Sequence, residues 1–126
     1  MTSLPRYLYH GTTHDKLIDI SSQGLRPRKR SDSWNFVESR GRTGLFLSDT
    51  EDEATKWAYR VAAEDELRGE PVVLRFDRAR VTTGIFNDKV AAGIGNWVAS
   101  ETIFPQHIEM RMGNRWVPIR EAMARR

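Results

Sequence analysis

The chain of 126 residues contains no cysteine and only three histidines. Without cysteine the protein can form no disulfide bond and no zinc site built from thiolates, so we expect no metal. No stretch approaches the ~20 apolar residues of a membrane-spanning helix, and the first residues lack the apolar core of a secretion signal. The sequence therefore predicts a soluble, cytoplasmic protein that does not bind a membrane.

The chain has little excess of charge of one sign, because 20 Lys and Arg stand against 17 Asp and Glu and the formal net charge is only +3. Basic residues nevertheless cluster locally, at Arg26, Arg28, Lys29 and Arg30 and again at Arg40 and Arg42. Such a cluster suits a phosphate-bearing partner, and a solvated loop is the alternative interpretation. Residues 26–42 show no sustained period, so we expect a long mobile loop that can act as a lid.

The length fits a single domain, residues 1–126, with four Trp, five Phe and three Tyr to build its core. Residues 7–9 form a short aromatic strand, followed by a turn and a helix over residues 15–23 that Gly24 closes. In this scheme Thr12 caps the helix together with Asp15.

Residues 44–48 are predicted to form a second strand, and Thr50 with Glu53 begins the best helix of the chain. Its apolar stripe consists of Ala54, Trp57, Ala58, Val61 and Ala62, and Gly69 and Pro71 end it. Further strands are expected at residues 71–76 and from Trp97, and residues 108–112 and 116–119 form a hairpin around Gly113-Asn114. Two main helices between strands indicate an α+β fold.

The tetrapeptide Tyr9-His10-Gly11-Thr12 is a candidate start of a nicotinamide-dinucleotide pocket. His10 can form a hydrogen bond with a ribose hydroxyl, and Gly11 allows a flat carboxamide to approach the backbone. A plain turn at the end of a strand is the alternative.

Several motifs in order resemble those of a known family. They are Leu8-Tyr9-His10-Gly11-Thr12, Ile20, Gln23-Gly24-Leu25, Leu47-Ser48, Ala54, Gly69-Glu70-Pro71-Val72-Val73-Leu74 and Gly95-Asn96-Trp97-Val98. The chain resembles the ADP-ribosyltransferase superfamily, and within it the NAD-binding C-terminal lobe of the KptA-like RNA 2′-phosphotransferases. Its early motifs are also similar to those of the poly(ADP-ribose) polymerases. The resemblance implies the ADP-ribosyltransferase fold, with split antiparallel sheets and two main helices, and NAD as co-substrate.

The chain also departs from the KptA-like pattern. We find no counterpart of the N-terminal RNA-binding lobe, and only the last catalytic arginine of that family has one, Arg42. Phe46 replaces the second histidine of the family's strand and stands where the polymerases have a tyrosine. Glu101 lies near the position of the catalytic glutamate of true ADP-ribosyltransferases, and Glu109 is a rival for that role.

The resemblance implies roles for nine residues. Glu101, His10 and Arg42 would be catalytic, and His10, Gly11, Thr12, Gly24, Arg42, Phe46, Ser48 and Trp57 would bind NAD. Phe46 and Trp57 would enclose nicotinamide, although both fit ordinary core positions. Ser48 and Thr12 would bind ribose or cap helices. The alternation of residues 108–112 puts Glu109 on the exposed face.

We therefore expect an NAD-dependent mono-ADP-ribosyltransferase whose acceptor is nucleic acid, RNA above all. A protein acceptor, or a small molecule as in the rifamycin-modifying enzymes, is an alternative, and a toxin or phage effector is a plausible context. The alternative of another class is a non-catalytic module that binds NAD, ADP-ribose or RNA ends.

Overall fold

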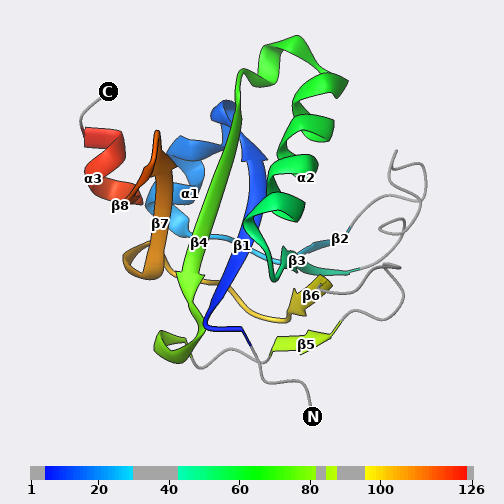
Figure 1. The fold of residues 1–126 in the computed structure, drawn as a ribbon, viewed down its shortest axis with the longest axis vertical. Coiled ribbons are helices and arrows are strands. Elements are labelled where there is room, and N and C mark those ends of the chain that lie inside the picture. The colour runs from blue at the N-terminus through cyan, green and yellow to red at the C-terminus, as the bar shows by residue number, and fades with distance from the viewer. Residues whose placement is uncertain (1–4, 30–42, 82–84, 88–95, 125–126) are drawn as a thin grey trace.

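The computed structural model describes residues 5–29, 43–81, 85–87 and 96–124. Its elements are β1 (Tyr7–Thr13), η1 (His14–Lys16), α1 (Leu17–Gln23), β2 (Arg28–Lys29), β3 (Thr43–Ser48), α2 (Glu51–Glu64), η3 (Glu66–Arg68), β4 (Pro71–Asp77), η4 (Arg78–Arg80), β5 (Ile85–Asn87), β6 (Asn96–Ala99), η5 (Pro105–His107), β7 (Ile108–Met112), β8 (Arg115–Pro118) and α3 (Ile119–Ala124). This arrangement confirms the α+β class (Figure 1).

The sheet has the strand order β5-β6-β3-β1-β4-β7-β8, with β2 paired to β3. Strands β1 and β4 pair in antiparallel register over seven residues. In contrast, Tyr9 opposite Ser48 is the one registered pair between β1 and β3 in the part of the chain described. The sheet therefore consists of two halves, β5-β6-β3 and β1-β4-β7-β8, which meet at this pair (Figure 1).

Strand β1 is longer than the sequence indicated. It continues through His10, Gly11 and Thr12 because each of these residues pairs with a residue of β4. The predicted turn is therefore wrong, and so is the predicted Thr12 cap. Thr13 precedes the first helical turn instead, and its hydroxyl contacts the carboxylate of Asp15.

Helix α2 begins where its sequence predicts. The Thr50 hydroxyl accepts a hydrogen bond from the backbone N–H of Glu53, at 3.2 Å. Of the apolar stripe, Ala54 and Ala58 are fully buried. The helix ends at Glu64, well before Gly69, because a separate helical turn, η3, follows it.

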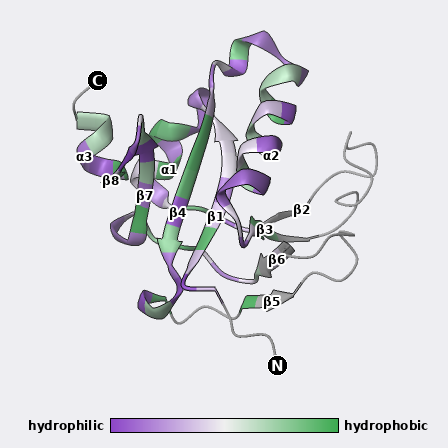
Figure 2. Ribbon diagram, in the orientation of Figure 1, coloured by the Kyte–Doolittle hydropathy of each residue, from purple (hydrophilic) through white to green (hydrophobic). Residues whose placement is uncertain are grey.

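The main core lies on the face of the sheet turned away from α2. Leu8 of β1 and Leu74 of β4 meet Leu17 of α1 and Ile119 of α3 there, and all four are fully buried. Figure 2 shows that β4 is hydrophobic along most of its length, as expected for a strand covered on both faces.

The hairpin of β7 and β8 is confirmed, and Gly113 adopts a positive φ of 64° in its turn. Strand β5 and helix α3 were not predicted. None of the helices in the described ranges is long and apolar enough to cross a membrane.

Candidate functional site

His10 lies at the junction of the two sheet halves. Its ring Nδ1 donates a hydrogen bond to the backbone carbonyl of Phe46, at 3.0 Å. A carbonyl oxygen only accepts, so Nδ1 carries a proton. The contact fixes both the orientation and the tautomer of the ring, and it brings together two residues that the sequence assigned to one site.

Ser48 and Thr12 are both buried, with exposures of 3% and 6%. Neither residue caps a helix, because Thr50 caps α2 and Thr13 precedes η1. The alternative role of helix cap is therefore wrong for both residues. Ser48 lies at the end of β3, opposite Tyr9, which is next to His10.

Gly11 faces helix α2. A Cβ atom at Gly11 would lie 2.1 Å from the carbonyl oxygen of Ala54 and 2.7 Å from the backbone nitrogen of Ala58. Side chains alternate between the faces of a strand, so His10 is directed to the opposite face, that of Leu8. A glycine is required at position 11 to bring α2 this close to β1.

Trp57 is a half-buried residue on the flank of α2. Thr55 and Tyr59 lie on the flank toward β7, where they line an open groove with Met112. Since helical residues are rotated by about 100° each, Trp57 is on the other flank, toward β3. The guanidinium of Arg60 lies 5.3 Å from the centre of its ring.

Gly24 has a structural role at the end of α1. Its φ is 88°, and its N–H donates to the carbonyl of Ile20 at 2.8 Å. A Cβ at this position would lie 2.2 Å from the carbonyl oxygen of Ile103. Leu25 forms backbone hydrogen bonds with the same Ile103, so the end of α1 is fixed against the segment that carries Glu101.

Glu101 is exposed and lines a groove of about 580 Å³. Other residues of the groove are Pro27, Arg80, Ser100, Phe104 and His107. None of the other predicted site residues in the described chain is part of its lining. Glu101 nevertheless follows the end of β6, which pairs with β3, the strand of Phe46.

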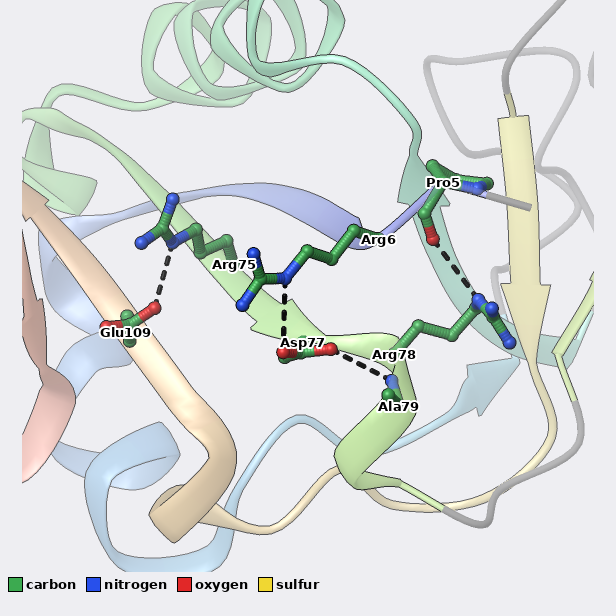
Figure 3. Close-up of polar contacts among 7 residues, drawn as sticks. All are labelled: Pro5, Arg6, Arg75, Asp77, Arg78, Ala79 and Glu109. Carbon is green, nitrogen blue, oxygen red and sulfur yellow. Dashed lines mark hydrogen bonds and ion pairs between the residues drawn. The ribbon is translucent and has the colours of Figure 1, made fainter. Parts of the chain in front are cut away.

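Glu109 has a different environment from Glu101. Its carboxylate forms an ion pair with Arg75 at 2.9 Å (Figure 3). As the alternation predicts, Glu109 lies on the face of β7 opposite the buried Ile108 and Met110, and 34% of its side chain is exposed. The Arg75 guanidinium also lies over the rings of Tyr7, at 4.1 Å, and Trp116, at 4.4 Å. Glu109 is on β7, which β4 separates from β1, so it belongs to the half-sheet that does not contain Phe46.

Among the acidic residues that the structure describes, Asp77 has a clearly lowered pKa. The backbone N–H of Ala79 donates to its carboxylate at 3.0 Å, and Arg6 forms an ion pair with it at 3.5 Å (Figure 3). The hydrogen bond from Ala79, and then the charges of Arg6 and Arg80, lower the pKa of Asp77 below its ordinary 3.8. Arg80 thus connects this charge cluster to the groove of Glu101.

No family model and no curated protein matches this chain. The assignment of the site therefore rests on the residues themselves. Arg42 and most of the predicted lid, residues 30–42, lie outside the described residues. Within the predicted loop, Arg28 and Lys29 instead form β2, paired with Gly44 and Thr43 of β3.

The sequence analysis assigned no lining residue of the Glu101 groove other than Glu101 to a site, and Arg80, Phe104 and His107 are among those it missed. Arg80 is in a separate segment from Glu101, and only the tertiary structure brings the two together. Phe104 carried a signal that could have been used, because it directly precedes Pro105. A residue before proline is held in an extended conformation, which orients its side chain.

Proposed function

We propose that the protein is an NAD-dependent mono-ADP-ribosyltransferase with the ADP-ribosyltransferase fold. The observation that carries the proposal is the ring of His10, held on the carbonyl of Phe46 where the two sheet halves meet. In the described part of the chain, β1 pairs with β3 only at Tyr9. The residues of β1 that follow Tyr9 have no partner registered on β3. Alternate backbone amides of β1 turn toward that edge, and these are groups that can bind a carboxamide.

The residues near the junction suit the parts of NAD. The ring of His10 can form a hydrogen bond with a ribose hydroxyl, and the buried hydroxyl of Ser48 lies on the neighbouring strand. Phe46 and Trp57 would supply aromatic rings for nicotinamide, from β3 and from the flank of α2 toward β3. Since Trp57 is on the α2 side of the sheet and His10 is directed to the other side, NAD in this proposal reaches both of them past the edge of β1 that faces β3. Gly11 has its role in the packing of α2, so its contribution to NAD binding would come only from its backbone.

The reaction needs a carboxylate. As the bond between nicotinamide and C1″ of the ribose breaks, its electron pair leaves with neutral nicotinamide and positive charge develops on the ribose. Glu101 stabilises this charge through the 2″-hydroxyl. An oxygen or nitrogen of the acceptor then bonds to C1″, and its proton, where it carries one, passes to solvent.

Glu101 is preferred to Glu109 because of the sheet topology. Glu101 follows β6, the strand next to that of Phe46, whereas Glu109 is already paired with Arg75 on the other half-sheet. The acceptor favoured by the basic cluster of the sequence, Arg26, Arg28, Lys29 and Arg30, is nucleic acid, RNA above all. Within this cluster Arg26 forms an ion pair with Asp19 at 3.0 Å.

The test is release of nicotinamide from NAD by the wild-type protein and by Glu101→Gln, with and without RNA. We expect Glu101→Gln to lower the rate of release by about 10²–10³-fold, the usual loss for one electrostatic group, with unchanged NAD affinity. His10→Ala should weaken NAD binding, because the ring contacts bound NAD in this proposal.

The matched control is Glu109→Gln, which removes the same charge from the other half-sheet and should retain the rate. Loss of release in Glu109→Gln with full activity in Glu101→Gln would reverse the assignment. Binding of NAD without release by the wild type would refute the enzyme and favour a non-catalytic NAD-binding module.

A further inference from the structure

We propose that the groove beside Glu101 binds one nucleotide unit of a single-stranded nucleic-acid acceptor, with the base on Phe104 and the phosphate at Arg80. The inference rests on the proposed function, because that function gives Glu101 its catalytic role. Binding of a nucleotide to the groove can nevertheless be measured without NAD. The groove, at about 580 Å³, falls within the size range of small-molecule sites.

Phe104 is exposed although backbone hydrogen bonds fix the segment that carries it. Its neighbours Ile103 and Pro105 are both buried, yet Phe104 is 56% exposed. Ile103 is fixed by two backbone hydrogen bonds to Leu25, each of 2.9 Å, and the carbonyl of Phe104 accepts from the N–H of His107 at 3.1 Å. The ring is therefore presented to solvent from a segment that is anchored on both sides.

An anchored, exposed aromatic ring at the wall of a groove is a suitable surface for base stacking. Stacking tolerates any base, because every base has a π-face. The polar residues of the groove suit the remainder of a nucleotide: Arg80 can pair with a phosphate, and Ser100 and His107 can form hydrogen bonds with sugar or base edges.

The chemistry favours a nucleotide over a basic peptide. Arg80 is exposed in the groove and His107 is half-buried there, and Glu101 is the one acid among the described lining residues. Pro27 at the rim directly precedes Arg28 and Lys29 of β2, so the chain leads from the groove into its basic cluster.

The first experiment measures binding by fluorescence anisotropy, with a short labelled oligoadenylate as RNA and as DNA, and with AMP as competitor. We expect Phe104→Ala to weaken binding of the oligonucleotide roughly tenfold, the loss of one stacked base. Tyr59→Ala is the matched control, because Tyr59 is also an exposed aromatic residue, at 63%, but lies on α2 outside this groove. Tyr59→Ala should bind the oligonucleotide as tightly as the wild type does.

Arg80→Gln should weaken binding and reduce the slope of log K against log salt by about 0.7, the value for one phosphate contact on a single strand. Arg115→Gln, the same charge change on β8, should leave the slope unaltered. Equal losses in both arginine variants, or in Phe104→Ala and Tyr59→Ala, would overturn the proposal. So would the absence of binding to RNA, DNA and AMP alike.

The second readout separates this inference from the proposed function. In Phe104→Ala, nicotinamide release to water and the KM for NAD should equal those of the wild type, while transfer to the oligonucleotide falls. A raised KM for NAD would overturn the inference, because the groove would then hold part of NAD rather than the acceptor. Oligonucleotide binding that depends on Phe104, without any release by the wild type, would refute the transferase and leave the nucleotide site standing.

Discussion

Substitution of Gly11 by alanine tests the packing of α2 against β1. The new Cβ would lie 2.1 Å from the carbonyl oxygen of Ala54, whereas real Cβ contacts are essentially never shorter than 3.0 Å. The opposing atoms belong to the helix backbone, so no side chain can rotate away. The helix must therefore recede by about 0.9 Å or distort.

The cost can be estimated from what this movement breaks. A gap of 0.5–1 Å forfeits roughly a quarter to a half of the dispersion energy of the contacts across it, and overpacking of a core typically costs about 1–3 kcal/mol. Ala54 and Ala58 are both fully buried under this contact, so we expect the upper end, about 3 kcal/mol. For a domain of this size that lowers Tm by roughly 10 °C.

The assay is thermal unfolding followed by far-UV circular dichroism, with Gly113→Ala as control. Gly113 has a positive φ of 64° but nothing within 4 Å of an added Cβ, so that variant should lose only about 1 kcal/mol. A Tm of Gly11→Ala close to that of the wild type would refute the close approach of α2. Lowered NAD affinity at full stability would instead indicate that Gly11 is needed for the ligand.

Two further predictions concern individual side chains. Thr50→Ala removes the hydroxyl that accepts from the Glu53 N–H, and it should destabilise the domain by about 1 kcal/mol in urea unfolding, whereas Thr50→Ser should not; equal loss in both would contradict the capping role. The lowered pKa of Asp77 means that its carboxylate stabilises the fold above its unfolded pKa of 3.8 and loses this effect as the pH falls through the lower folded value. Asp77→Asn should therefore be less stable than the wild type at neutral pH and converge with it in strong acid, and a difference that persists in acid would show that another property of Asp77 matters.

Local signals explain which parts of the fold were predictable from the sequence. Thr50 with Glu53 and the turn at Gly113-Asn114 involve neighbouring residues only, and both were located correctly. The length of β1 was not predictable, because Gly11 and Thr12 are extended through their pairing with Val73 and Val72, which are far along the chain.

The same distinction applies to the candidate site. The contact between His10 and Phe46 joins two residues that motif order had already singled out. The groove of Glu101 draws on Pro27, on Arg80 and on the segment up to His107, and no local pattern relates these three segments. Gly24 ends α1, as its position after residues 15–23 predicted. The close approach of protein backbone to Gly11 and Gly24 was not predictable, since both glycines suggested ligand contacts instead.

The split sheet also determines how far the domain can be divided. Strand β1 pairs with β4 and β3 pairs with β6, so the partners of the two half-sheets are interleaved along the chain. A break in the polypeptide anywhere between Ser48 and Pro71 separates strands of both halves at once. Neither half-sheet is formed by a contiguous stretch of sequence, because strands of the other half lie between its own strands along the chain. Each half-sheet is therefore completed only after strands from late in the chain have been synthesised, β6 for one half and β7 and β8 for the other.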